Sequence, residues 1–85
     1  MIEMRHVIMD ALGIHARPAG MLVKQCSSFN CAIQIGTAEK MVDAKRIMGV
    51  MGLAAKQGTE VTITFDGDDE KQASEAVLAF LKEHL

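Results

Sequence analysis

The sequence predicts an α+β fold, a two-layer open-faced β-sandwich in which a four-stranded antiparallel sheet carries three helices on one face. Two observations lead to this expectation. Short segments with alternating apolar and polar residues, which are typical of half-buried strands, recur along the chain. Between them, apolar residues repeat at the spacing of an amphipathic helix. The resulting order is β-α-β-β-α-β-α, and elements with one apolar face bury it by packing helices on a sheet.

The first part of the chain is predicted to form a strand, a turn and a helix. Residues 3–9 alternate as a strand, and residues 10–13 have the composition of a turn. A helix is expected from about 16 to 28, and Pro18 suits its first turn, where a missing N–H costs nothing. The apolar stripe of this helix consists of Ala19, Leu22, Val23, Cys26 and Phe29.

The middle of the chain is predicted to form a hairpin and a short helix. Residues 31–35 alternate as a strand, a turn begins at Gly36 and Thr37, and residues 40–44 form a short return strand. Residues 47–54 are apolar and are interpreted as a short helix, which its two glycines weaken.

The last part of the chain is predicted to form a strand and a helix. Residues 60–66 alternate clearly, and acidic residues at 68–70 suit the first turn of the final helix. The buried stripe of that helix is expected to contain Ala73, Ala76, Val77, Phe80 and Leu81. Polar residues interleave the core positions of the strands and predict a solvent-facing side of the sheet, with Arg5, Gln34, Thr62 and Thr64 on it.

Length and composition restrict the function classes. The 85 residues, of which 49% are hydrophobic, suit one domain covering 1–85 with one core. No apolar run is long enough for a bilayer and no signal-peptide pattern is present, so we expect a cytoplasmic protein without membrane insertion. Residues 1–59 carry seven Lys/Arg against four Asp/Glu, whereas residues 60–85 carry two against seven. The basic part suits an anionic ligand or an acidic partner protein, but its charge is too small to indicate nucleic-acid binding.

The motif GIHARPAG, residues 13–20, places a histidine and an arginine at the start of the first predicted helix. The first turn of a helix has N–H groups without intrahelical partners, and these favour phosphate. An uncharged imidazole at His15 has a free lone pair and can act as a nucleophile. A phosphoryl group on it would lie over the helix start formed by Ala16, Arg17 and Pro18, where Arg17 could balance its charge. A surface histidine without a role is the alternative at this level.

The segments GIHARPAGMLV, KRIMGVMGL and QGTEVTITFDGDDE closely resemble the HPr family, the histidine-containing phosphocarriers of the phosphoenolpyruvate-dependent sugar phosphotransferase system. The likeness covers essentially the whole chain. It implies that His15 is phosphorylated through Nδ1 and that Arg17 is the active-centre arginine. It implies enzyme I as phosphoryl donor and the IIA domain of a sugar permease as acceptor. A shuttle of this kind has no turnover of its own, needs no cofactor or metal, and is expected to be a monomer.

The resemblance also implies a docking surface beside the histidine. By spacing alone, methionines in the short helix would be assigned to the core, whereas in the family the matching helix binds partners. The implied surface has an apolar centre with a basic rim, and it comprises Gly20, Met21, Lys24, Lys45, Arg46, Ile47, Met48 and Met51. Flexible methionine side chains can adapt to several partners.

Position 46 departs from the pattern of many Gram-positive relatives, which have a serine that a kinase phosphorylates for catabolite control. Arg46 has no hydroxyl, so this regulation is not expected at that position. An arginine at a helix start also loses a capping contact and opposes the helix dipole. It could strengthen docking to acidic partners, or it could reflect drift in a lineage without the kinase.

Other interpretations remain beside this one. A nitrogen-branch or regulatory member of the same family would act mainly through protein binding, and the nitrogen-branch carrier would keep both His15 and Arg17. The GVMG segment fits the loop of KH RNA-binding domains only in its glycines, and DGDDE lacks the ligand spacing of a calcium loop. Cys26 and Cys31 could form a disulfide or half of a metal site, but buried free thiols are the simpler interpretation.

Overall fold

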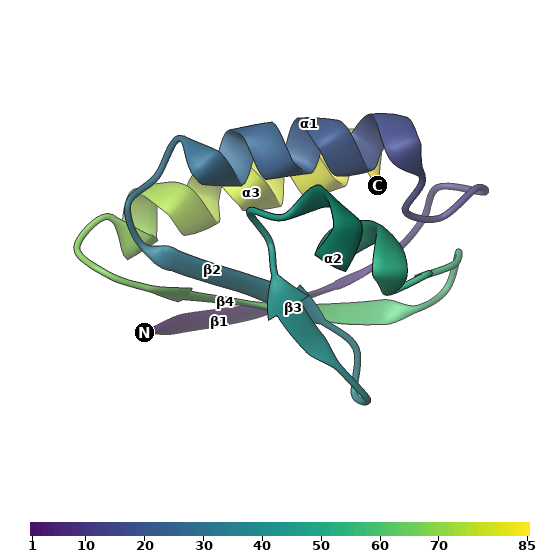
Figure 1. Cartoon of the computed structure of the whole chain (residues 1–85), viewed down its shortest axis with the longest axis horizontal. Coiled ribbons are helices and arrows are strands. Elements are labelled where there is room, and N and C mark those ends of the chain that lie inside the picture. The colour runs from purple at the N-terminus through teal and green to yellow at the C-terminus, as the bar shows by residue number, and fades with distance from the viewer.

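The computed structural model describes all 85 residues and contains one four-stranded antiparallel sheet with three helices on one face (Figure 1). This confirms the predicted α+β sandwich and its element order. In chain order the elements are β1 (Ile2–Val7), α1 (Ala16–Ser27), β2 (Ala32–Gly36), β3 (Met41–Asp43), α2 (Ile47–Gly52), β4 (Glu60–Asp66) and α3 (Glu70–His84).

The sheet has the strand order β1-β4-β2-β3, so β4 lies between β1 and β2 although it is the last strand in the sequence. Phe65 is opposite Ile2 on one side and Ile33 on the other, and this register places apolar side chains of all three strands on the face under the helices. On the opposite face Arg5 and Gln34 are exposed, as the alternation predicts. None of the helices is long and apolar enough to cross a membrane.

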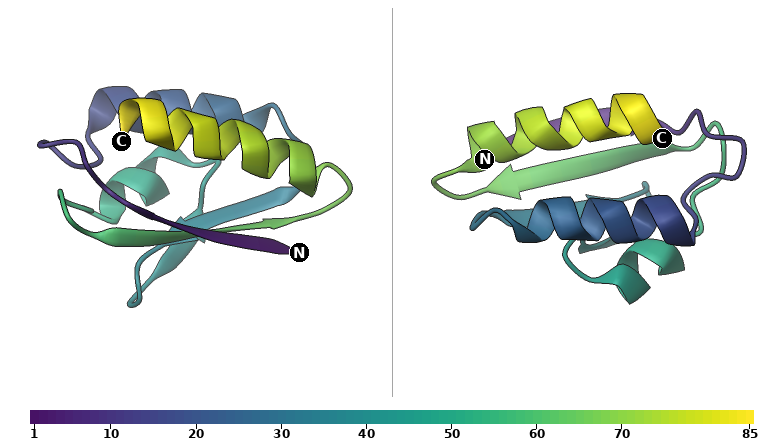
Figure 2. Two further views of the ribbon diagram at one scale, coloured as in Figure 1. Left: turned by 180° about the vertical axis from the view of Figure 1, so that it is seen from behind. Right: turned by 90° about the horizontal axis from the view of Figure 1, so that it is seen from above.

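The two longer helices lie side by side across the apolar face and run in opposite directions (Figure 2). The end of α3 therefore lies at the same end of the molecule as the start of α1, next to the loop between β1 and α1. The short helix α2 packs against α1 and β3 through the buried Val50. This arrangement brings three segments that are far apart in sequence to one end of the molecule.

The core is one cluster of 19 buried residues, all apolar, with Leu22, Phe65 and Leu81 among the largest fully buried ones. The predicted stripes are confirmed at most positions, but Val23, Phe29 and Ala76 are only half-buried. Cys26 and Cys31 are free and buried, so the interpretation as buried thiols is confirmed. Burial raises the pKa of Cys26 to about 12 and also raises the pKa of Cys31, which keeps both groups protonated and unreactive.

Several predicted boundaries were wrong by one or two residues. The first strand ends at Val7 rather than residue 9, because its partner β4 begins at Glu60, directly opposite Val7. The second strand lies one residue later than predicted, since the N–H of Cys31 donates to Asp69 instead of to a strand. The predicted strand 40–44 is limited to three residues. The helix predicted over 47–54 stops at Gly52, and Ala54 then takes a left-handed conformation with φ 51°.

Candidate functional site

His15 is the residue immediately before α1 and has an extended backbone, with φ −123° and ψ −179°. Its carbonyl accepts the N–H of Ala19 at 2.9 Å, which is the first hydrogen bond of the helix. The N–H groups of Ala16 and Arg17 therefore precede the helical ladder, and Pro18 has no N–H. The imidazole caps none of them and its side chain is 37% exposed. A partly exposed nitrogen base thus stands beside unpaired amides that favour an anion.

The loop before His15 is fixed by backbone contacts. Gly13 has φ 68°, its N–H donates to the carbonyl of Asp10 at 2.9 Å, and the N–H of Ile14 donates to the carbonyl of Ala55 at 2.9 Å. The Oδ1 atom of Asp10 accepts the N–H of Leu12 at 2.8 Å. Because Ile14 is buried and both of its neighbours are constrained, the loop holds His15 at one position relative to the sheet.

The Asp10 carboxylate also faces the histidine, since its Oδ1 lies 3.9 Å from Nε2 of His15. This distance is too long for a direct hydrogen bond but short enough for an electrostatic preference. The carboxylate favours a proton on Nε2, which leaves Nδ1 as the ring nitrogen with the free lone pair. Asp10 is therefore the acidic group that lies nearest to the imidazole of His15 among the ion pairs of the chain.

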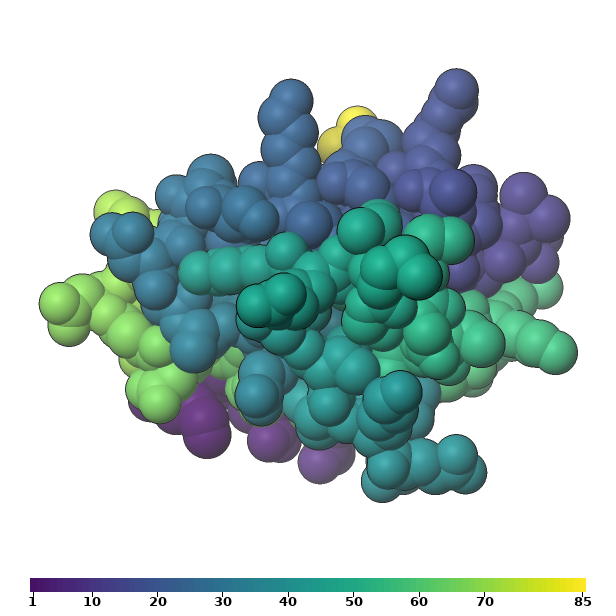
Figure 3. All heavy atoms as spheres, viewed as in Figure 1, coloured from purple at the N-terminus to yellow at the C-terminus, as the bar shows by residue number.

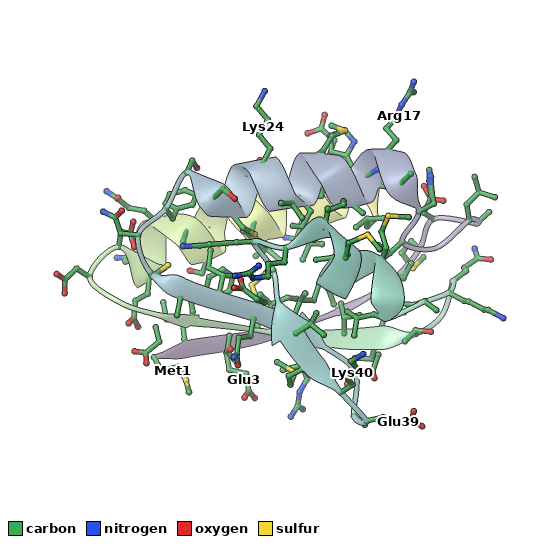
Figure 4. The ribbon with its side chains drawn as sticks, in the orientation of Figure 1. Met1, Glu3, Arg17, Lys24, Glu39 and Lys40 are labelled. Atoms are coloured by element: carbon green, nitrogen blue, oxygen red, sulfur yellow. The ribbon has the colours of Figure 1, made fainter.

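A surface hollow of about 120 Å³ lies at this end of the molecule. Arg17 extends from the first turn of α1 into solvent, with its guanidinium free of any ion pair (Figure 4). Larger hollows of about 430 and 360 Å³ lie on the open face of the sheet and beside residues 53–60, but neither is lined by a histidine, cysteine, lysine or arginine. The lining of the small hollow consists of Asp10, His15, Arg17, Pro18, Met21 and His84.

Helices α1 and α2 contact each other and lie next to each other on the face of the molecule seen in Figure 3, and both carry exposed apolar residues. Met48 is 79% exposed, and Met21, Ile47 and Met51 are also exposed. Gly20 is exposed on α1 beside Met21. Their spacing alone would assign the methionines of the short helix to the core. The structure shows instead that they are exposed.

The basic residues predicted around this surface have different surroundings. Lys24 points away from α1 into solvent (Figure 4). Lys45 is half-buried and its Nζ donates to the carbonyl of Phe29 at 2.8 Å, so it also connects the start of α2 to the end of α1. Arg46 is the residue before α2, its side chain is 81% exposed and it makes no capping hydrogen bond. Its Nε lies 3.8 Å from Oδ2 of Asp43.

Three residues near the histidine were not singled out from the sequence. The sequence predicts only a turn at Asp10, and it singles out no role for His84. Leu12, which is 74% exposed three residues before His15, was not considered. The feature of the sequence that could have indicated Leu12 is that it is an apolar residue inside a predicted turn. His84 gave no local signal, because it lies 69 positions from His15.

Comparison with known proteins agrees with this geometry. The family model described as "PTS HPr component phosphorylation site" matches residues 2–83. The phosphocarrier protein HPr of Lysinibacillus sphaericus is 50% identical over 76 residues, which cover 89% of this chain and 86% of the relative. The solved structure of a mycoplasma histidine-containing phosphocarrier protein is 41% identical, covers 96% of this chain and 93% of its own, and superposes with a TM-score of 0.93. An HPr dimer from Thermoanaerobacter tengcongensis is 37% identical over 98% of this chain and 95% of its own, with a TM-score of 0.78. The chain therefore belongs to the HPr family of phosphocarrier proteins of the phosphotransferase system.

Proposed function

We propose that this chain shuttles one phosphoryl group on His15, accepting it from phospho-enzyme I and passing it to the IIA domain of a sugar permease. The observation that carries the proposal is the position of His15, a partly exposed imidazole directly before two unpaired helix amides and Arg17. The whole chain, residues 1–85, acts as one domain in the cytoplasm. It performs no turnover of its own, because it ends each cycle only when an acceptor removes the group.

The transfer step uses the lone pair of Nδ1. As this nitrogen forms a bond to phosphorus, the bond from phosphorus to the donor breaks and its electron pair returns to the donor. Asp10 favours the proton on Nε2 and so keeps Nδ1 available. The phosphoryl oxygens then face the N–H groups of Ala16 and Arg17, and the guanidinium of Arg17 balances charge that is spread over three oxygens.

Partners dock on the exposed apolar surface of α1 and α2, whose centre is Met21, Ile47, Met48 and Met51. A patch of this kind, close to the reacting histidine, fits the need to bind a donor and several acceptors in turn. Lys24 and Arg46 supply exposed positive charge at its rim, which suits partners with acidic rims. A monomer exposes this surface fully, so we propose the monomer as the working form, even though the Thermoanaerobacter relative is described as a dimer.

Arg46 removes one route of regulation, because its side chain cannot be phosphorylated as a serine can. The exposed guanidinium instead adds positive charge at the start of α2. Comparing Arg46→Ser with the parent for binding to enzyme I at low and high salt tests this contribution. A loss of affinity that is larger at low salt supports docking by Arg46, and equal affinity at both salt concentrations contradicts it.

Intact-protein mass spectrometry after incubation with enzyme I and phosphoenolpyruvate tests the main proposal. We expect one acid-labile phosphate on the parent and none on His15→Ala. A parent that stays unmodified under conditions that charge another HPr would contradict the shuttle. Purified IIA from the sugar and nitrogen branches, offered separately to the phosphorylated protein, then identifies the branch by which acceptor takes the group.

A further inference from the structure

His84 occupies the last turn of α3 and lines the same hollow as His15 and Arg17. It is half-buried, and its ring packs against Phe80 with 4.8 Å between the ring centroids and 34° between the ring planes. His84 therefore faces a hollow that residues of α1 also line. A second histidine therefore stands at the proposed phosphoryl site, and the proposed transfer step assigns it no role.

The backbone keeps His84 at this place. The carbonyl of Leu85 accepts the N–H groups of Met9 and Asp10, and the N–H of Leu85 donates to Leu81 at 2.9 Å. Leu85 itself is buried. The end of α3 is thus bound to the loop that carries Asp10 and His15, so the distance from His84 to the reacting histidine is set by the fold.

The charges around this hollow change when a phosphoryl group arrives. Asp10 faces it from the loop, and His15 and Arg17 face it from α1. On α3 the neighbours of His84 are Lys82 and Glu83, which are exposed and outside the hollow. A phosphoryl group adds about two negative charges beside Asp10. It also lies near the end of α3, where free carbonyls already carry partial negative charge.

We propose that His84 is a positioning residue that binds a proton when His15 is phosphorylated and holds the phosphoryl oxygens from α3, while Arg17 holds them from α1. The inference rests on the proposed function, because it needs a phosphoryl group on His15. The proton comes from solution, so the phosphorylation of His15 depends on pH through His84. Protonated His84 offsets both the added anion and the partial charge of the helix end.

The coupling between protonation of His84 and phosphorylation of His15 has one free energy. The NMR titration and the competition experiment described below both measure it. If phosphorylation moves the titration midpoint of His84 up by about half to one pH unit, His84 contributes a factor of about three to ten to the phosphorylation equilibrium at low pH and none at high pH, relative to a variant without this histidine. The direction of this contribution is fixed, because protonated His84 favours the phosphorylated form. The two values have to agree, since they describe the same coupling free energy.

The first experiment follows the imidazole signals of His84 by NMR against pH, before and after charging with enzyme I and phosphoenolpyruvate. We expect a higher midpoint in the phosphorylated protein. An unchanged or lower midpoint, with His15 fully phosphorylated, overturns the inference and leaves the proposed function intact. Absence of any phosphate on His15 overturns both, so the two failures are distinguishable.

The second experiment measures the ratio of phosphorylated protein in mixtures of parent and variant that share one pool of enzyme I, so that the donor's own pH dependence cancels. His84→Gln should lose its share by about three- to tenfold at low pH and match the parent at high pH. Lys82→Gln removes a cation from the same helix end outside the hollow and should match the parent at every pH. A constant ratio for His84→Gln, or an equal effect of Lys82→Gln, overturns the inference.

Discussion

Replacement of Gly13 by alanine tests whether the loop before His15 is held as tightly as the contacts indicate. A Cβ atom at this position would lie 2.3 Å from the carbonyl oxygen of Ala55 and 2.8 Å from Cα of Lys56. Both are backbone atoms, so no side-chain rotation relieves the clash. Gly13 also has φ 68°, and a left-handed conformation costs a residue with a Cβ about 1 kcal/mol.

The separation of the two segments also stretches the hydrogen bond from Ile14 to Ala55. Loss of a buried bond of this kind costs about 1 kcal/mol, and strain in the displaced backbone adds about as much again. The sum predicts a decrease of about 3 kcal/mol in the free energy of unfolding, which lowers the melting temperature by roughly 10–20 °C in a domain of this size.

Two other glycines separate these causes in the same urea-unfolding assay. Gly58→Ala meets no atom within 4 Å but has φ 89°, so it should cost only about 1 kcal/mol. Gly20→Ala meets no atom within 4 Å inside α1 and should stabilise the protein by about 1 kcal/mol. If Gly13→Ala costs no more than Gly58→Ala, the close approach to Ala55 does not hold the loop, and our account of how His15 is positioned is wrong.

Arg46→Ser should raise the free energy of unfolding by about 1 kcal/mol, because a serine hydroxyl can accept an N–H at the uncapped start of α2, and an unchanged urea midpoint would contradict this. The N–H of Asn30 is the main cause that lowers the pKa of Asp69, so the stabilisation is complete above the ordinary aspartate pKa and is lost as pH falls through the lowered folded value. Asp69→Asn should therefore lower the urea midpoint at pH 7 and have a smaller effect at about pH 2, and a pH-independent effect would refute the assignment. Met48→Asp should weaken binding to enzyme I about tenfold while the free energy of unfolding changes by less than about 0.5 kcal/mol. Met41→Asp, on an exposed methionine of β3, is the matched control and should leave binding unchanged.

The local pattern of apolar and polar residues was sufficient to predict the first and last residues of those elements whose ends depend only on their own sequence. The strand β4 was predicted over its full length, because Val61, Ile63 and Phe65 alternate without interruption between polar neighbours. The end of β1 was predicted two residues too late, because it depends on where β4 begins to pair. A strand boundary of this second kind is a property of two segments together, and one segment alone does not contain it.

The distribution of charge along the chain predicted that the docking surface is basic. It did not predict which basic side chain is exposed and which one forms a hydrogen bond within the fold. Lys45 and Arg46 are neighbours and look equivalent in the sequence. In the structure the ammonium of Lys45 binds the carbonyl of Phe29, whereas the guanidinium of Arg46 stays exposed. A half-buried carbonyl at the end of α1 needs a donor, and which of the two neighbours reaches it is decided by the direction in which β3 enters α2.

The same distinction applies to the proposed site. His15 and Arg17 lie within one turn of the chain, so their juxtaposition with a helix start follows from local structure and was predictable. The opposite wall of the hollow is different, because it exists only where α3 runs antiparallel to α1 and its end is bound to the loop through Leu85. That geometry places the negative end of one helix dipole beside the anion-binding end of another. A phosphoryl site built there needs positive charge on both walls, and Arg17 supplies it on only one. The histidine at position 84 is the residue of α3 that lines the hollow, which is why its protonation, rather than further charge on α1, is the feature of this site to measure.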